Sequence, residues 1–102
     1  MSKRIETFKE FEEHWGRLEQ EFLNWIDQVI YKAGIDKKEC ADEIHQVKLW
    51  VGRLMENRVR KLIDKFFDEG ISDETIQKAF DQSEESFKRP VNEFIARWLR
   101  NR

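Results

Sequence analysis

Apolar residues recur along this 102-residue chain at alternating steps of three and four positions. In the first segment the series is Phe8, Phe11, Trp15, Leu18, Phe22, Trp25 and Val29. Such spacing places the side chains on one face of an α-helix, in a pattern similar to a heptad seam. Two further stripes run from Cys40 to Phe66 and from Ile76 to Trp98. The sequence therefore predicts an all-helical protein.

Glycines and capping residues separate the three stripes. Gly34 is a typical C-terminal stop, and Asp36 with Glu39 forms a capping-box pattern for the next helix. Gly70 ends that helix, and Ser72 caps the third. The expected helices, in a single domain of residues 1–102, cover about 5–33, 37–69 and 73–100.

Pro90 interrupts the third predicted helix, where it removes a backbone donor and favours a break or a kink. The apolar phase nevertheless continues from Phe87 through Val91 to Trp98. One helix that is kinked near Pro90 is therefore the first interpretation. Four helices, with a division at Pro90, are the alternative.

The three stripes predict an antiparallel three-helix bundle with a definite register. If the chain reverses near residues 35 and 71, residues at one level have numbers that sum to about 70 between helices 1 and 2, and to about 142 between helices 2 and 3. The resulting layers are apolar throughout: Phe8 with Leu62 and Phe80, Trp15 with Met55 and Phe87, Leu18 with Val51 and Val91, and Ile26 with Ile44 and Trp98.

Two residues of helix 2 do not fit an apolar core. In the same register Arg58 lies level with Glu12 and Glu84, which predicts a charged layer that fixes register more than it adds stability. Gly52 is expected on the core-facing side, level with Pro90, where a missing side chain would admit the kink.

No motif of the chain indicates catalysis, a metal or a cofactor. His14 and His45 lack the Glu-x-x-His spacing of helical metal sites, and there is no glycine-rich phosphate loop. The single Cys40 cannot form an intramolecular disulfide, which favours a reducing cytoplasm. No apolar run is long enough to span a membrane, so we expect a non-enzymatic protein without a membrane partner.

The helix 2 stripe leaves several apolar and basic residues uncovered. Trp50 lies outside the buried arc, and Leu49 and Phe67 lie on a different flank, near Arg53 and Arg60. Aromatic and arginine side chains of this kind are typical of interface hot spots. They predict a protein-interaction or regulatory bundle that binds a protein partner, with self-association into a homodimer as one form.

Nucleic-acid binding is the alternative function. It would use the bases of helix 2 and a basic C-terminal end, whose candidate anion-binding residues are Lys88, Arg89, Arg97, Arg100 and Arg102. The formal net charge of −2 and the alternation of acidic and basic segments argue against a single nucleic-acid face. A small regulator that inhibits another macromolecule is a further interpretation that the sequence leaves open.

Overall fold

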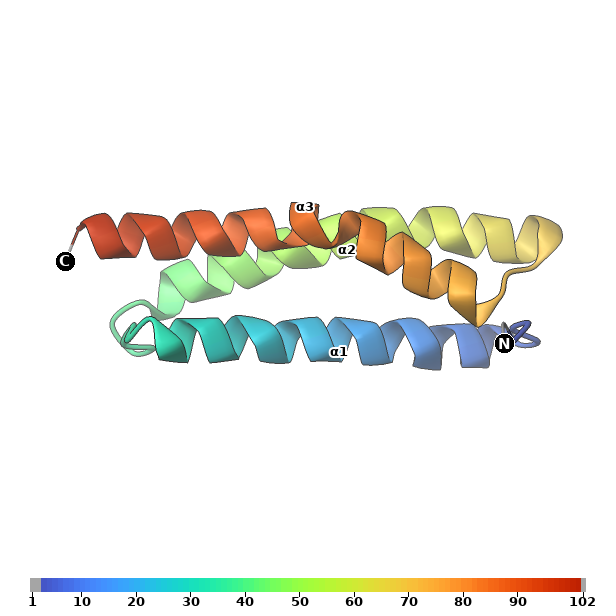
Figure 1. The fold of residues 1–102 in the computed structure, drawn as a ribbon, viewed down its shortest axis with the longest axis horizontal. Coiled ribbons are helices and arrows are strands. Elements are labelled where there is room, and N and C mark those ends of the chain that lie inside the picture. The colour runs from blue at the N-terminus through green and yellow to red at the C-terminus, as the bar shows by residue number, and fades with distance from the viewer. Residues whose placement is uncertain (1–2, 102) are drawn as a thin grey trace.

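A computed structural model describes residues 3–101 as three long α-helices that lie side by side (Figure 1). They are α1 (Phe8–Lys32), α2 (Ala41–Glu69) and α3 (Asp73–Arg100). The chain reverses at both connections, so α2 is antiparallel to α1 and α3, and the molecule measures 50 × 22 × 20 Å. The predicted antiparallel three-helix bundle is confirmed. None of the helices in this described part has the length and apolarity that crossing a membrane requires.

The ends of the helices follow local chemistry. The Thr7 side chain accepts a hydrogen bond from the Glu10 amide at 3.1 Å, and that of Ser72 accepts one from the Thr75 amide at 3.1 Å, so each caps the helix that follows. Gly70 adopts φ +83°, a left-handed conformation in which glycine is strongly favoured, and thereby ends α2.

The connection between α1 and α2 is longer than the sequence predicts. Asp36 Oδ1 accepts hydrogen bonds from the amides of Lys38 at 2.8 Å and Glu39 at 3.3 Å. These bonds hold residues 37–40 in turns, and α2 starts only at Ala41. The chain therefore reverses later than residue 35.

The core is one continuous apolar cluster along the whole bundle. Ile26, Ile30, Val51, Ile76, Val91 and Phe94 have no exposed surface. The backbones of α2 and α3 approach most closely, while aromatic rings separate α1 from both. Large and small apolar side chains from all three helices thus fill the space between the axes.

α1 is shifted from the predicted layers by about seven residues relative to α3. Relative to α2 the shift is about five residues, because Asp27 pairs with Lys48 and these numbers sum to 75 rather than about 70. The ring centroids of Trp15 and Phe80 are 5.5 Å apart, and those of Phe22 and Phe87 are 5.9 Å apart. The predicted layers instead pair Trp15 with Phe87 and Phe8 with Phe80. Because seven residues make nearly two full turns, the same stripe still faces the core after this shift. The predicted layers that include α1 are therefore wrong, by about one heptad in the pairing of α1 with α3.

The predicted charged layer does not form. Glu12 lines a groove with Glu56, Val59 and Ile63 of α2 but not with Arg58, and Glu84 pairs instead with Lys88 at 3.2 Å. Within residues 3–101, Arg58 has no ion pair to either carboxylate, and its buried Nε has no hydrogen-bond partner.

The prediction for Gly52 is also wrong. Gly52 is exposed, and a Cβ atom built on it would meet nothing within 4 Å. It follows Val51 by roughly 100° around the helix, which carries it past the buried arc. Trp50 and Leu54, not Gly52, are residues of α2 that line the same surface hollow as Pro90.

α3 passes through Pro90 as one continuous helix, so the four-helix alternative is wrong. Figure 1 shows that α3 changes direction near its middle. Pro90 cannot donate a backbone hydrogen bond, and its ring crowds the preceding turn, which is a common cause of such a bend.

A short clamp closes the end of the bundle opposite the α1–α2 connection. The Ile5 amide donates to the Ile71 carbonyl at 2.9 Å, and the Asp73 amide donates to the Lys3 carbonyl at 2.8 Å. Asp73 Oδ1 also accepts a hydrogen bond from the Lys3 amide at 2.8 Å. Both isoleucines are buried, so this clamp extends the core beyond the helices.

Candidate functional site

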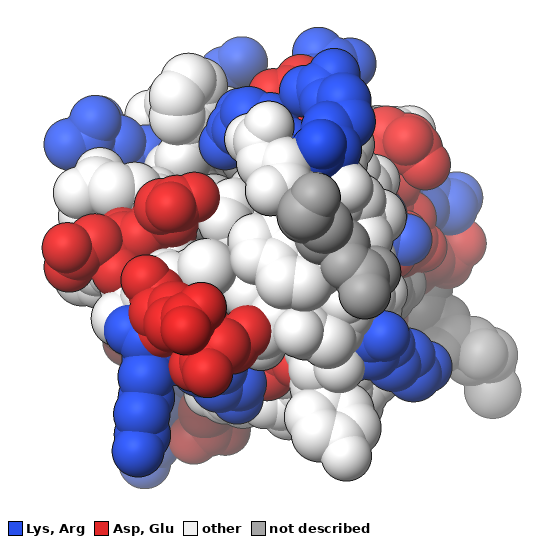
Figure 2. Space-filling model, turned by 90° about the vertical axis from the view of Figure 1, so that its left-hand side faces the viewer, with Lys and Arg blue, Asp and Glu red and all other residues white. Residues whose placement is uncertain are grey.

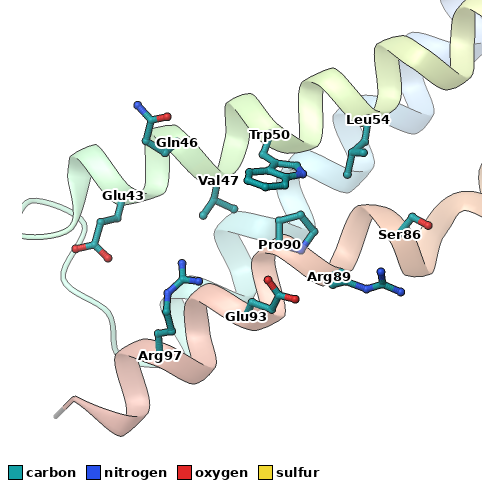
Figure 3. Close-up of a pocket in the computed structure, with 10 residues that line it drawn as sticks. All are labelled: Glu43, Gln46, Val47, Trp50, Leu54, Ser86, Arg89, Pro90, Glu93 and Arg97. Atoms are coloured by element: carbon teal, nitrogen blue, oxygen red, sulfur yellow. The ribbon is translucent and has the colours of Figure 1, made fainter.

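The largest surface hollow described lies between α2 and α3, with a volume of about 600 Å³ (Figure 3). Its apolar floor consists of Val47, Trp50 and Leu54 from α2 and Pro90 from α3. We call this hollow the α2–α3 groove. The indole of Trp50 and the ring of Pro90 lie across the groove from each other (Figure 3).

The order of residues along the two helices explains the groove. Trp50 precedes the fully buried Val51, so its Cβ leaves α2 at the edge of the core and the side chain stays 63% exposed. On α3, the facing positions Ser86 and Pro90 are one turn apart and carry short side chains. These short side chains leave unfilled space between α3 and Trp50.

Charged side chains of both signs form the rim. Glu43 and Gln46 lie on the α2 side, and Arg89, Glu93 and Arg97 follow one another at four-residue steps on the α3 side. Across residues 3–101, none of these four charged groups forms an ion pair within 4 Å. The rim therefore offers both carboxylates and guanidinium groups to a bound molecule.

The structure divides the predicted partner-binding residues between two surfaces. Trp50 belongs to the α2–α3 groove, whereas Leu49, Arg53, Arg60 and Phe67 recur at helical spacing on the face of α2 that points away from the core. We call Leu49, Arg53, Glu56, Arg60, Asp64 and Phe67 the outer row of α2.

The outer row is open to solvent over its whole length. Leu49 is 45% exposed and Phe67 is 67% exposed. The ring of Phe67 also packs against that of Phe8, with 5.5 Å between the ring centroids. Arg60 pairs with Glu56 on the next turn at 2.6 Å. The row is therefore a second apolar and charged surface, separate from the groove.

The candidate anion-binding residues do not form one surface. Lys88 lies 5.1 Å over the Trp25 ring and pairs with Glu84, while Arg89 and Arg97 belong to the groove rim. Arg100 is exposed in the last turn of α3, and Arg102 lies outside the described residues. Figure 2, a view onto the end of the bundle where α3 terminates, shows basic and acidic groups on the same face.

A smaller polar hollow surrounds His14 near the clamp. The Nδ1 atom of His14 lies 3.1 Å from Nη2 of Arg17. Burial of the imidazole, together with the charge of the Arg17 guanidinium, lowers the pKa of His14 below its usual value of 6.5. The hydrogen bond from the Lys3 amide lowers the pKa of Asp73. In the described part of the chain, no three His, Cys, Asp or Glu side chains are arranged to hold a metal ion.

The remaining cysteine and histidine are unremarkable in position. Cys40 is buried at the start of α2, and burial raises the pKa of its thiol. His45 is exposed. Neither lines the groove.

Sequence reasoning identified Trp50 but missed the groove in which it lies. Val47 and Leu54 lie within the apolar stripe from Cys40 to Phe66, which predicts them as core residues, and the sequence predicts only a kink at Pro90. A short side chain one turn before Pro90, at Ser86, is the signal that could have indicated a hollow on α3.

No protein-family model matches this chain, and searches of curated proteins and of solved structures return no significant match. Its function is therefore argued from the geometry of these surfaces.

Proposed function

We propose that this protein is a non-enzymatic interaction module that binds an amphipathic helix of a protein partner in the α2–α3 groove. The observation that carries the proposal is Trp50, which is 63% exposed on the floor of a 600 Å³ hollow. Tryptophan and arginine dominate the binding energy of many protein interfaces.

The shape and charge of the groove define the partner. α2 and α3 run side by side and form the two walls of the groove. The apolar face of a partner helix would fit between them, and its side chains would contact Trp50 and Pro90. Arg89 and Arg97 are about 12 Å apart along α3. A partner helix with carboxylates two turns apart on one flank would reach both guanidinium groups.

The proposal includes a cytoplasmic location, because the one cysteine, Cys40, is buried and unbridged. It favours a protein over a nucleic acid, because Glu43 and Glu93 stand on the same rim as the arginines and would repel phosphates. A regulatory role follows if the bound helix belongs to another macromolecule whose activity changes on binding.

A displayed library of amphipathic helical peptides tests the proposal directly. Peptides would be selected on the wild-type protein and measured by fluorescence anisotropy against wild type and Trp50→Ala. We expect selected peptides to carry apolar residues at helical spacing with flanking acids, and to lose at least tenfold in affinity on Trp50→Ala. Arg53→Ala, on the outer row, is the matched control and should bind like wild type.

Two results would contradict the proposal. Peptides that bind wild type and Trp50→Ala equally would place the site elsewhere. Tight, steeply salt-dependent binding of single- or double-stranded DNA or RNA oligonucleotides, with no peptide selected, would favour the nucleic-acid function instead.

A further inference from the structure

The outer row of α2 keeps most of its apolar and charged surface exposed, and Leu49 is 45% and Phe67 67% exposed. Leu49 and Phe67 are 18 residues apart, which is five full turns or about 27 Å, so they lie in line at the two ends of the row. Between them, Arg53 and Asp64 form no ion pair within 4 Å in the described residues. Apolar ends and unpaired charges therefore share one helix face.

Glycine at position 52 adds to this pattern. Gly52 lies inside α2, where glycine destabilises a helix relative to alanine, and a Cβ atom there would meet nothing within 4 Å. The fold of one chain thus gives no reason for the missing side chain. A glycine beside the outer row would let another helix approach α2 closely.

We propose that the outer row binds the outer row of a second copy of this chain, with the two α2 helices antiparallel. A two-fold axis that crosses α2 near residue 58 brings together residues whose numbers sum to about 116. Leu49 then meets Phe67 of the second copy, and Glu56 meets Arg60 of the second copy. In this antiparallel arrangement, the outer row of one copy is complementary in apolarity and charge to the outer row of the other.

The unpaired charges fit the same arrangement. Arg53 and Asp64 are 11 residues apart, about three turns, so they lie on the same flank of the row. A two-fold axis perpendicular to the helices keeps this flank on the same side in both copies, and it places Arg53 level with Asp64 of the second copy. Each dimer therefore gains two such pairs.

A parallel arrangement is less complementary. It would place every residue of the row level with its own counterpart, so that Arg53 meets Arg53 and Asp64 meets Asp64. The antiparallel pair instead matches apolar with apolar and acid with base at every step. This dimer does not depend on the α2–α3 groove, which lies on another side of α2.

Sedimentation equilibrium of the full chain over a range of concentrations tests the dimer. The mass is expected to rise from 12.5 kDa toward twice that value. Arg53→Glu, which sets one acid opposite Asp64 of the second copy in each of the two symmetric pairs, should weaken the dimer at least tenfold. The double variant Arg53→Glu/Asp64→Arg should restore it, and because these positions are about 16 Å apart on one helix, that rescue cannot occur within a single copy.

Trp50→Ala is the control for the groove and should leave the dimer unchanged, with circular dichroism confirming the helical fold of each variant. A monomer at every concentration would overturn the proposal, as would a dimer that Arg53→Glu does not weaken or that the double variant fails to restore. A dimer lost on Trp50→Ala alone would overturn it as well, by assigning self-association to the groove.

Disulfide trapping tests the orientation. In a Cys40→Ala background, Leu49→Cys mixed with Phe67→Cys is expected to form a crosslinked heterodimer, while neither variant crosslinks alone. Homodimers crosslinked through Leu49→Cys alone would show a parallel pair and overturn the antiparallel arrangement.

Discussion

Replacing Arg58 with methionine is expected to stabilise the bundle. The Nε atom of Arg58 is buried and has no hydrogen-bond partner. A buried donor left without a partner costs about 1–3 kcal/mol. Methionine keeps an unbranched, flexible side chain against the apolar neighbours and removes this donor. The expected gain in the free energy of unfolding is about 1–2 kcal/mol, which for a domain of this size raises Tm by roughly 5–15 °C.

Urea denaturation at neutral pH, followed by far-UV circular dichroism, measures this gain. At a protein concentration at which the chain is a monomer, Arg60→Met is the matched control on the same helix, because Arg60 is exposed and pairs with Glu56 at 2.6 Å. Loss of such a surface pair changes stability by at most about 1 kcal/mol. A loss of about 3–5 kcal/mol on Arg58→Met would refute the reasoning, because it would mean that Arg58 is held in a buried ion pair.

Three further predictions concern helix ends, glycines and pH. Ser72→Ala removes the cap that accepts the Thr75 amide and should cost about 1 kcal/mol in urea denaturation. Gly52→Ala should stabilise the folded monomer by about 0.5–1 kcal/mol because the space is empty, whereas Gly70→Ala should lower Tm because φ is +83° and Arg4 Nη2 lies 2.7 Å from the new Cβ. The lowered pKa of His14 means that the unfolded chain takes up the proton first as pH falls, so Tm should drop as pH decreases through and below 6.5, and His14→Gln should flatten that decline.

The sequence predicted the three helices because their signals are local. Apolar spacing depends on neighbours three and four positions away, and Ser72 and Gly70 act on the turns next to them. The tight connection at Gly70 also made the α2–α3 register predictable: Leu54 and Ser86, whose numbers sum to about 140, line the same groove, close to the predicted sum of about 142.

The register of α1 was not predictable in the same way. A stripe that repeats every seven residues faces the core equally well after a shift of one heptad, so apolar pairing cannot distinguish the two alignments. The connection decides between them. Asp36 holds a turn that delays α2 until Ala41, and whether a capping residue starts a helix or only a turn depends on contacts beyond its own segment.

The α2–α3 groove was hidden for a related reason. Its floor combines Trp50 with Pro90, and each of these residues has a separate interpretation in the sequence. Only a continuous α3 places the proline against the tryptophan, and continuity through Pro90 depends on packing of Val91 and Phe94, both fully buried, against the rest of the bundle.

The clamp between residues 3–5 and 71–73 is expected to open before the helices of the bundle unfold. It joins residues 66 to 70 positions apart in the sequence with a few hydrogen bonds, while the helices are held by hydrogen bonds between near neighbours. Detaching the first residues breaks these bonds and exposes Ile5 without disturbing any helical turn. In native-state hydrogen exchange the Ile5 amide should therefore exchange through a small fluctuation, ahead of the core amides of α3, which exchange only when the bundle opens as a whole.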